Sequence, residues 1–237
     1  MNIASANQIE KNVRELFALG AHLGHKKNRL HPKARKYVYQ IVNGVSIIDL
    51  TKTVNKLEQA KAFLTAQAKE GKSLLMVATK KIVNQHAANL CREHSIPFVS
   101  MKWQSGLLTN FQTIIKNVKK LQMLKDQKAN GEWEKYVKHE RMALDKHLMR
   151  LERFYGGLLT LTKHPDILFI IDSKKERNAL IEAKSNNIPV VGIIDTNSDP
   201  DQLDFPIVLN DDSPVVLERV ISELIQSYVK GKPQATV

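Results

Sequence analysis

Apolar residues in the middle of the chain recur with the spacing of two amphipathic helices. The first pattern has apolar side chains at spacings of 3, 4 and 3: Phe111, Ile114, Val118 and Leu121. The second has them at spacings of 4, 3 and 4: Leu144, Leu148, Leu151 and Tyr155. Asn130-Gly131 lies between the two patterns and is typical of a turn. One narrow apolar stripe on each helix suits two antiparallel helices that pack along a single seam, so we predict an antiparallel coiled-coil arm over residues 105–155.

Outside this arm, short apolar runs alternate with amphipathic helical patterns. The runs predict strands at 74–78, 97–100, 167–171, 190–194 and 207–209. The helical patterns predict helices at 80–93, 175–185 and 214–228. Strands that are apolar throughout are typical of a parallel sheet covered on both faces. The pattern therefore predicts one three-layer α/β domain into which the helical arm is inserted.

The N-terminal part of the chain has shorter elements. A helical pattern that includes Leu16 ends at Gly20, and apolar strands at 37–41 and 45–48 flank Asn43-Gly44, a signal for a β-hairpin. A helix is expected from Asp49 to about residue 69, where Gly71 stops it. We predict four parts: a basic N-terminal segment (1–36), an α/β domain (37–104 and 156–230), a helical hairpin (105–155) and a flexible tail (231–237).

The charge of the sequence indicates what kind of partner the protein binds. The formal net charge is +12 at pH 7, and residues 102–153 carry 12 Lys and Arg against 6 Asp and Glu. Such an excess favours a polyanionic partner such as RNA, although a basic enzyme with a solvated surface has the same composition. Residues 195–218 reverse the sign, with seven acids and no Lys or Arg. We expect that acidic edge to face away from phosphate, or towards a basic protein or a metal ion.

Other features of the composition exclude whole classes of protein. A single cysteine, Cys91, excludes an intramolecular disulfide framework and a Cys-rich zinc module, and its helical context predicts a small core residue. The sequence contains no secretory signal pattern and no run of about 18 uncharged apolar residues. These absences predict a soluble intracellular protein.

Catalytic motifs are weak. Gly71-Lys72-Ser73 resembles the end of a phosphate-binding loop, but Ala66 stands where the first glycine belongs and the segment precedes its strand. No dinucleotide fingerprint and no nucleophile elbow occurs. The remaining candidates are strand-end carboxylates that hold a structural Mg²⁺ or act as acid and base: Asp172, Asp195 and Asp199. The alternative is that they cap backbone groups in turns.

The basic loops indicate RNA binding more consistently than the motifs above indicate catalysis. The segment after Gly24 has six Lys and Arg and no acid, which suits a loop laid on phosphate. Lys80 and Lys81 follow a strand end, and Lys102 stands beside the potential stacking ring of Trp103. The alternatives are a solvated surface for the lysines and core packing for the tryptophan. The candidate RNA-binding residues are His22, His25, Lys26, Lys27, Asn28, Arg29, His31, Lys33, Arg35, Lys36, Lys80, Lys81, Lys102, Trp103, Asn110, Lys116, Lys119 and Lys120. The histidines lack the neighbours of a recognisable metal site, so we predict no histidine-bound metal.

Three stretches match one known protein family in order. The first is Leu16-Phe-Ala-Leu-Gly-Ala-His-Leu-Gly-His25 with the basic loop through Lys33; the second is Lys102-Trp-Gln-Ser-Gly-Leu-Leu-Thr-Asn110; the third begins at Pro165, includes Glu176, Glu182 and Pro189, and ends in Ile194-Asp-Thr-Asn-Ser-Asp-Pro-Asp201. On these motifs the chain resembles the bacterial-type small-subunit ribosomal protein S-two family over nearly its whole length. Lys102 and Ser105 stand where that family usually has Arg and Gly.

The resemblance implies a flavodoxin-like sheet with a protruding coiled-coil arm and no catalytic activity. It also implies a structural role on ribosomal RNA between the head and body of the small subunit. The expected partners are that RNA, neighbouring small-subunit proteins and the large S-one protein in bacteria that have it. The expected location is a cytoplasmic bacterial ribosome, with an organellar ribosome left open. Two rivals stay open: a nucleotide- and Mg²⁺-binding α/β enzyme, and a coiled-coil adaptor that binds only protein.

Overall fold

Five parallel strands form the central sheet of the protein, which we describe over residues 3–233 of a computed structural model. The strands are β4 (Leu74–Val77), β5 (Phe98–Val99), β6 (Ile167–Ile171), β7 (Val190–Ile194) and β8 (Phe205–Val208). They lie in the order β5-β4-β6-β7-β8, and every neighbouring pair is parallel. Counted within this sheet, the order is 2-1-3-4-5, as in flavodoxin-like folds. The predicted strands at 167–171 and 190–194 are confirmed residue for residue, whereas the last strand begins two residues before its predicted start.

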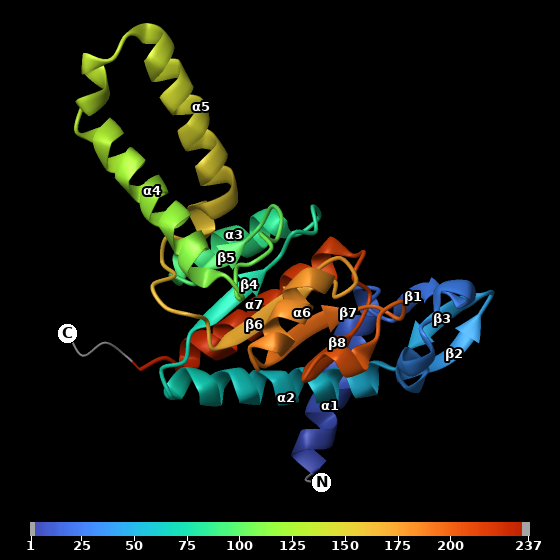
Figure 1. The fold of residues 1–237 in the computed structure, drawn as a ribbon. Coiled ribbons are helices and arrows are strands. Elements are labelled where there is room, and N and C mark those ends of the chain that lie inside the picture. Colours follow the sequence, from blue (N-terminus) through green and yellow to red (C-terminus); the bar gives the residue numbers. More distant parts are fainter. Residues whose placement is uncertain (1–2, 234–237) are drawn as a thin grey trace.

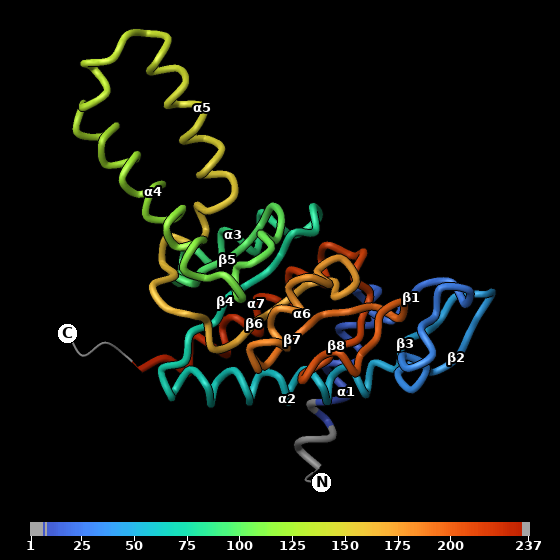
Figure 2. Tube along the Cα trace, viewed as in Figure 1, coloured from blue at the N-terminus to red at the C-terminus, as the bar shows by residue number. Residues whose placement is uncertain are grey.

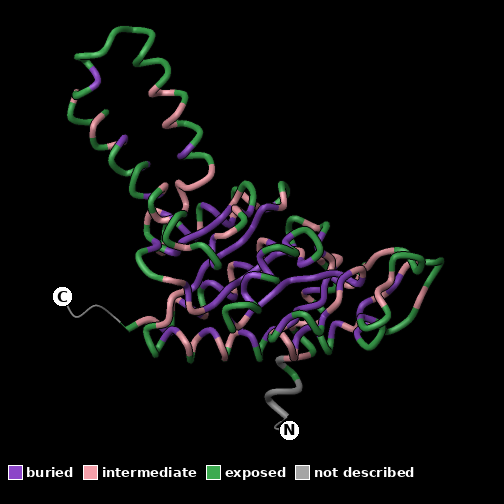
Figure 3. Tube along the Cα trace, viewed as in Figure 1, coloured by how far each residue is buried: buried purple, intermediate pink, exposed green. Residues whose placement is uncertain are grey.

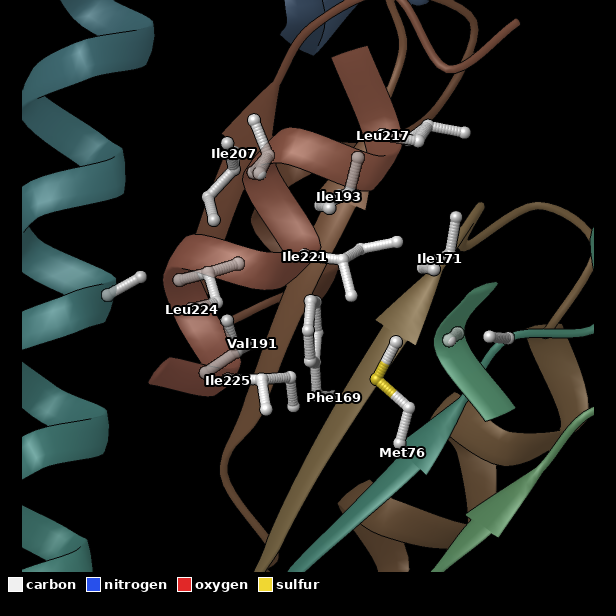
Figure 4. Packing of buried hydrophobic residues seen from close by; sticks show 14 of the residues in the cluster. Met76, Phe169, Ile171, Val191, Ile193, Ile207, Leu217, Ile221, Leu224 and Ile225 are labelled. Carbon is white, nitrogen blue, oxygen red and sulfur yellow. The ribbon is translucent and has the colours of Figure 1, made fainter. Parts of the chain in front are cut away.

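Successive side chains of each strand enter two different cores. Met76 and Phe169 pack on one face of the sheet with helices α2 (Leu50–Lys69), α3 (Asn84–Glu93) and α7 (Pro214–Gly231). Leu75 and Leu168 pack on the other face with α6 (Arg177–Ser185). Figure 4 shows Met76, Phe169, Val191 and Ile193 facing the apolar side of α7. Helices thus cover both faces of the sheet, which is the predicted three-layer arrangement. The strands are apolar without interruption because neither of their faces meets water.

A local sequence signal begins helix α2. Asp49 caps α2, because its carboxylate accepts hydrogen bonds from the backbone N–H groups of Thr51 and Lys52. Helix α3 begins at Asn84 and not at the predicted residue 80, because residues 81–83 form turns in which the backbone N–H of Val83 donates to the carbonyl oxygen of Lys80. Cys91 is buried on α3, and burial raises the pKa of its thiol to about 12, which agrees with the predicted core role. Helix α7 continues to Gly231, past its predicted end; residues 234–237 of the predicted tail lie outside the described residues.

The basic N-terminal segment is more ordered than the predicted loop. Helix α1 (Ile3–Ala18) ends before Gly20, which has the positive φ of +80° expected at such a stop. Strands β1 (Leu23–Lys26), β3 (Val45–Ile48) and β2 (Val38–Val42) then form a small antiparallel sheet in the order β1-β3-β2, set beside the main sheet in Figure 1. The β2–β3 hairpin confirms the prediction. Strand β1 and the 3₁₀ turns at Lys27–Arg29 and Pro32–Tyr37 replace the predicted unstructured loop.

A helical hairpin, which we call the arm, is inserted in the sequence between β5 and β6 and projects from the body of the protein (Figure 2). It consists of α4 (Phe111–Ala129), a short 3₁₀ turn (Glu132–Lys135) and α5 (Lys138–Tyr155). Leu121, Leu124, Trp133 and Leu151 are buried between the helices. The ion pairs Lys125–Glu152 and Lys128–Asp145, each 2.6 Å long, join α4 to α5 beside this seam. Two packed helices are thus present, and a coiled-coil supercoil in them stays a prediction.

The chain returns from the arm at a position that admits only glycine. A Cβ added at Gly157 would overlap the carbonyl oxygen of Phe98 and come within 2.8 Å of its ring. We expect Gly157→Ala to lower the free energy of unfolding by about 2 kcal/mol, because β5 must move to make room. Urea unfolding measures the change. Gly156→Ala is the control: its Cβ would meet only the flexible Glu152 side chain, so a change below about 1 kcal/mol is expected. Equal losses in both variants would contradict this explanation.

Candidate nucleic-acid interface

The basic loop and the acidic edge, which lie more than 160 residues apart in sequence, meet in the structure. The backbone N–H of His25 donates to Thr196 Oγ1 at 3.0 Å, and that of His31 donates to the carbonyl oxygen of Thr196 at 2.9 Å. His25 Nδ1 lies 2.7 Å from the carboxylate of Asp195, which is buried at the end of β7. These bonds hold the small sheet against the carboxyl end of the main sheet.

Two of the six loop cations form ion pairs with this edge. Lys33 lies 3.0 Å from Asp199, and Lys36 lies 2.7 Å from Asp201. The hydrogen bond from Lys36 holds the pKa of Asp201 below its ordinary value and raises the pKa of Lys36. The acidic edge therefore meets cations of the chain's own basic loop at these two carboxylates, and its orientation away from phosphate stays a prediction. Lys33 and Lys36 are partly neutralised within the chain, because the fold brings them to carboxylates about 165 residues away.

The other four cations of the loop remain exposed. Lys26, Lys27, Arg29 and Arg35 have no carboxylate partner within residues 3–233. Asn28 is exposed between them. Because three of these cations belong to one strand end and the 3₁₀ turn that follows it, their charges are concentrated on one short stretch of surface.

Lys80 is an internal ion-pair partner, whereas Lys81 is free. Lys80 Nζ lies 2.8 Å from a carboxylate oxygen of Asp211 and 2.8 Å from one of Asp212, after the end of β8. Beside it, the hydroxyl of Thr79 donates to the buried carboxylate of Glu176. Lys80 therefore ties the end of β4 to the segment before α7. Lys81 is exposed and has no carboxylate partner in the described residues.

The buried Asp211 makes stability depend on pH. Burial raises its pKa to about 6, with Lys80 opposing that shift. The folded protein then holds a proton that the unfolded chain releases near pH 4, so the free energy of unfolding falls as the pH rises from 4 to 6. We expect this group to account for a loss of about 2–3 kcal/mol over that window. Urea unfolding at pH 4.5 and 6.5 should show a flatter dependence in Asp211→Asn.

Asp212→Asn is the matched control for that experiment. The hydrogen bond from Lys80 lowers the pKa of Asp212, so its stabilising effect is present above about pH 4 and is lost only at lower pH. The variant should therefore keep the wild-type slope between pH 4.5 and 6.5. A slope that Asp211→Asn leaves unchanged would overturn the assignment to Asp211.

Trp103 belongs to the core of the protein and not to its surface. The side chain is only 5 % exposed, and its indole N–H donates to Glu182 at 3.0 Å. The predicted stacking of this ring on RNA does not fit its position, and core packing is the correct alternative. Lys102 beside it is exposed without a carboxylate partner in the described part of the chain. Asn110 is also exposed, and its side-chain oxygen accepts from the hydroxyl of Thr113 at 2.8 Å.

Glu182 is the residue that positions this loop. Its carboxylate also accepts hydrogen bonds from the backbone N–H groups of Gly106 at 2.8 Å and Leu108 at 2.9 Å. One buried side chain on α6 thereby shapes the segment that leads into the arm. In the sequence Glu182 stands out only as part of a family motif, because no local signal marks a carboxylate whose partners lie more than 70 residues away.

Three predicted cations lie on the outer side of the arm. Lys116, Lys119 and Lys120 are exposed on α4. Lys119 and Lys120 follow Lys116 by three and four positions, which places all three on one side of the helix. Ile114 and Val118 face the opposite direction, into the core. None of the three lysines has a carboxylate partner within residues 3–233.

The strand-end carboxylates do not converge on a common point. Asp172 accepts from the backbone N–H of Lys175 at 3.2 Å, and Asp199 accepts from that of Asp201 at 3.0 Å, as turn residues do. Asp195 is engaged by His25. Among the described residues, no group of three or more His, Cys, Asp and Glu side chains is arranged to hold a metal ion. The engagement of these carboxylates in turns, in a hydrogen bond with His25 and in an ion pair with Lys33 weighs against the candidate Mg²⁺ site.

His22 contacts an aromatic side chain of the protein itself. Its ring packs on Phe17, with centroids 4.1 Å apart.

Comparison with known proteins gives one consistent result. A family model described as Ribosomal protein S2 matches residues 16–231. The chain is 36 % identical over 221 residues to "Small ribosomal subunit protein uS2" of Dehalococcoides mccartyi strain 195, an alignment that covers 93 % of this chain and 90 % of the relative. It is 35 % identical, with the same coverage, to the protein of that name from strain CBDB1. The matched range includes the basic loop, the acidic edge and the arm.

Proposed function

The chain belongs to the ribosomal protein S2 family, and we propose on that premise that it is a structural constituent of the small ribosomal subunit. The observation that carries the proposal is the family match across residues 16–231, which leaves no part of the α/β body unmatched. The relatives are named as ribosomal proteins and not as enzymes, in agreement with the predicted absence of catalytic activity.

We further propose that the protein binds ribosomal RNA through nine exposed cations that have no carboxylate partner within residues 3–233. They are Lys26, Lys27, Arg29, Arg35, Lys81, Lys102, Lys116, Lys119 and Lys120. Each can approach a phosphate without first breaking an ion pair to a carboxylate, which supports phosphate binding at these positions. Lys33, Lys36 and Lys80 have a different role in this proposal, because their carboxylate partners hold the small sheet and the strand ends together.

The position between head and body of the subunit, the four-part domain division and the supercoiling of the arm are part of the same proposal. So are contacts with neighbouring ribosomal proteins, including the S-one protein, and a cytoplasmic, ribosome-bound location. Within residues 3–233, none of the helices combines the length and the apolar composition that a membrane crossing requires.

The two rival functions have less support. The enzyme rival needs Asp172, Asp195 and Asp199 around one Mg²⁺, and those carboxylates are engaged in turns and in a hydrogen bond with His25. An adaptor that binds only protein gives no role to the nine unpaired cations named above. RNA binding that weakens with added salt distinguishes the ribosomal function from the adaptor.

Sedimentation of a gentle, low-salt lysate through a sucrose gradient tests the proposal directly. We expect the chain to travel with the small subunit and to leave it only in a high-salt wash. If the chain stays at the top of the gradient as a free 26.9 kDa protein while the ribosomes are intact, the proposed function is wrong.

A further inference from the structure

A second stripe of side chains runs along α5, separate from its buried seam. Met142, Lys146, Met149 and Arg153 follow one another at spacings of 4, 3 and 4, the same spacings as in the seam. Such spacings align side chains on one side of a helix. Met142 is 53 % exposed and Met149 is 65 % exposed, on an arm whose outer surface is largely open (Figure 3). The stripe has the periodicity of a helix–helix contact, and no other helix of the described chain covers it.

Helix α5 carries more positive than negative charge. Its three acids are all engaged: Asp145 and Glu152 pair with lysines of α4, and Glu140 accepts from the backbone N–H of Val137. Its five cations have no carboxylate partner within residues 3–233: Lys138, Arg141, Lys146, Arg150 and Arg153. A partner on this surface therefore meets a positive field that the arm itself does not neutralise.

An apolar groove lies beside the stripe. A cavity of about 420 Å³ is lined by Lys125 of α4 and by Leu148, Met149, Glu152 and Arg153 of α5. Leu148 and Met149 provide its apolar lining, and the aliphatic stems of Lys125 and Arg153 extend it. Methionine is well suited to such a contact, because its flexible thioether side chain adapts to the shape of a partner.

We propose that the Met142–Arg153 stripe and this groove are the docking surface for an acidic amphipathic helix of another small-subunit protein. The partner helix places apolar side chains on Met142 and Met149 and carboxylates opposite Lys146 and Arg153, as in a helix laid into a groove. RNA fits less well, because phosphates gain nothing from the two methionines. A second copy of this chain would oppose one basic α5 to another. The inference rests on the proposed function, since it identifies a partner within the subunit.

Site-specific photo-crosslinking in assembled subunits tests this inference. The full chain carries p-benzoylphenylalanine in place of Met149, and small subunits are purified, irradiated and analysed by mass spectrometry. We expect the crosslink to join residue 149 to a protein segment that is rich in Asp and Glu and has apolar residues at spacings of three and four. The same photo-crosslinker at Met123, which is 49 % exposed on α4, should not capture that segment.

A charge reversal provides the second measurement. Lys146→Glu should lower the yield of the crosslink from residue 149 about fivefold, because it places like charges together. Lys69→Glu, on α2 and outside the proposed RNA contacts, should leave the yield unchanged. A crosslink to RNA, a crosslink to a segment without excess acid, or no crosslink from subunits that contain the chain would each overturn the inference. Absence of the wild-type chain from the small-subunit fractions would instead refute the proposed function, and this is seen on the gradient before irradiation.

Discussion

Glu182→Ala is expected to lower the free energy of unfolding by about 4 kcal/mol, one of the two largest effects we predict for this protein. The carboxylate is buried and accepts from Trp103 Nε1 and from the backbone N–H groups of Gly106 and Leu108, at 2.8–3.0 Å. Alanine leaves these buried donors without an acceptor and a space where the side chain had been. Urea unfolding gives the stability, and the fluorescence of Trp103 in a Trp133→Phe background reports on the loop.

Glu182→Gln is the matched comparison for the alanine variant. The amide keeps one acceptor oxygen but turns an N–H₂ group towards the remaining donors, so we expect a smaller loss, about 2 kcal/mol. A red-shifted Trp103 emission in the alanine variant would show that the loop has opened to water. If both variants unfold like the wild type, the carboxylate does not hold the loop as its contacts indicate.

Replacing Lys26, Lys27 and Arg29 together by glutamine is expected to weaken RNA binding about 100-fold at 0.1 M salt. Each lost phosphate contact should lower the slope of log affinity against log salt by about 0.7–0.9, so the slope should fall by about 2–3 in total. All three side chains are exposed and have no carboxylate partner in the described residues. Filter binding of the purified chain to a small-subunit ribosomal RNA transcript, over a series of salt concentrations, measures both quantities.

The control for this experiment removes the same charge from elsewhere. Lys11, Lys69 and Lys230 are exposed, lie outside the proposed contacts and have no carboxylate partner within residues 3–233. Their joint replacement by glutamine should change the slope by less than about 0.5, because no bound phosphate is released. Equal slopes in the two triple variants would mean that net charge alone governs binding, and the assignment of Lys26, Lys27 and Arg29 would then fail.

Periodicity in the sequence was sufficient for the main elements. The strands of the parallel sheet are apolar at every position because both faces are covered, so the runs at 167–171 and 190–194 could be located to the residue. The seam of the arm could be located in part for a similar reason, since a helix that packs on one side repeats its apolar residues every three or four positions. Leu121 and Leu151 are buried in that seam, whereas Ile114 and Val118 of the predicted stripe pack into the core of the body. Strand β1 escaped prediction, because its short segment is basic and pairs with residues of β3 that lie 19 to 24 positions later.

The sequence indicated only part of the candidate nucleic-acid interface. The sequence by itself determined the excess of positive charge, the family resemblance and the positions of the basic loops. Only the tertiary structure decided which cations are available: Lys33 and Lys36 meet carboxylates about 165 residues away, whereas Lys26, Lys27 and Arg29 do not. It likewise placed Trp103 in the core, against a glutamate 79 residues later. The physical reason is that an ion pair or a buried hydrogen bond depends on distance in space, which the fold of the whole chain sets, whereas periodicity depends only on near neighbours.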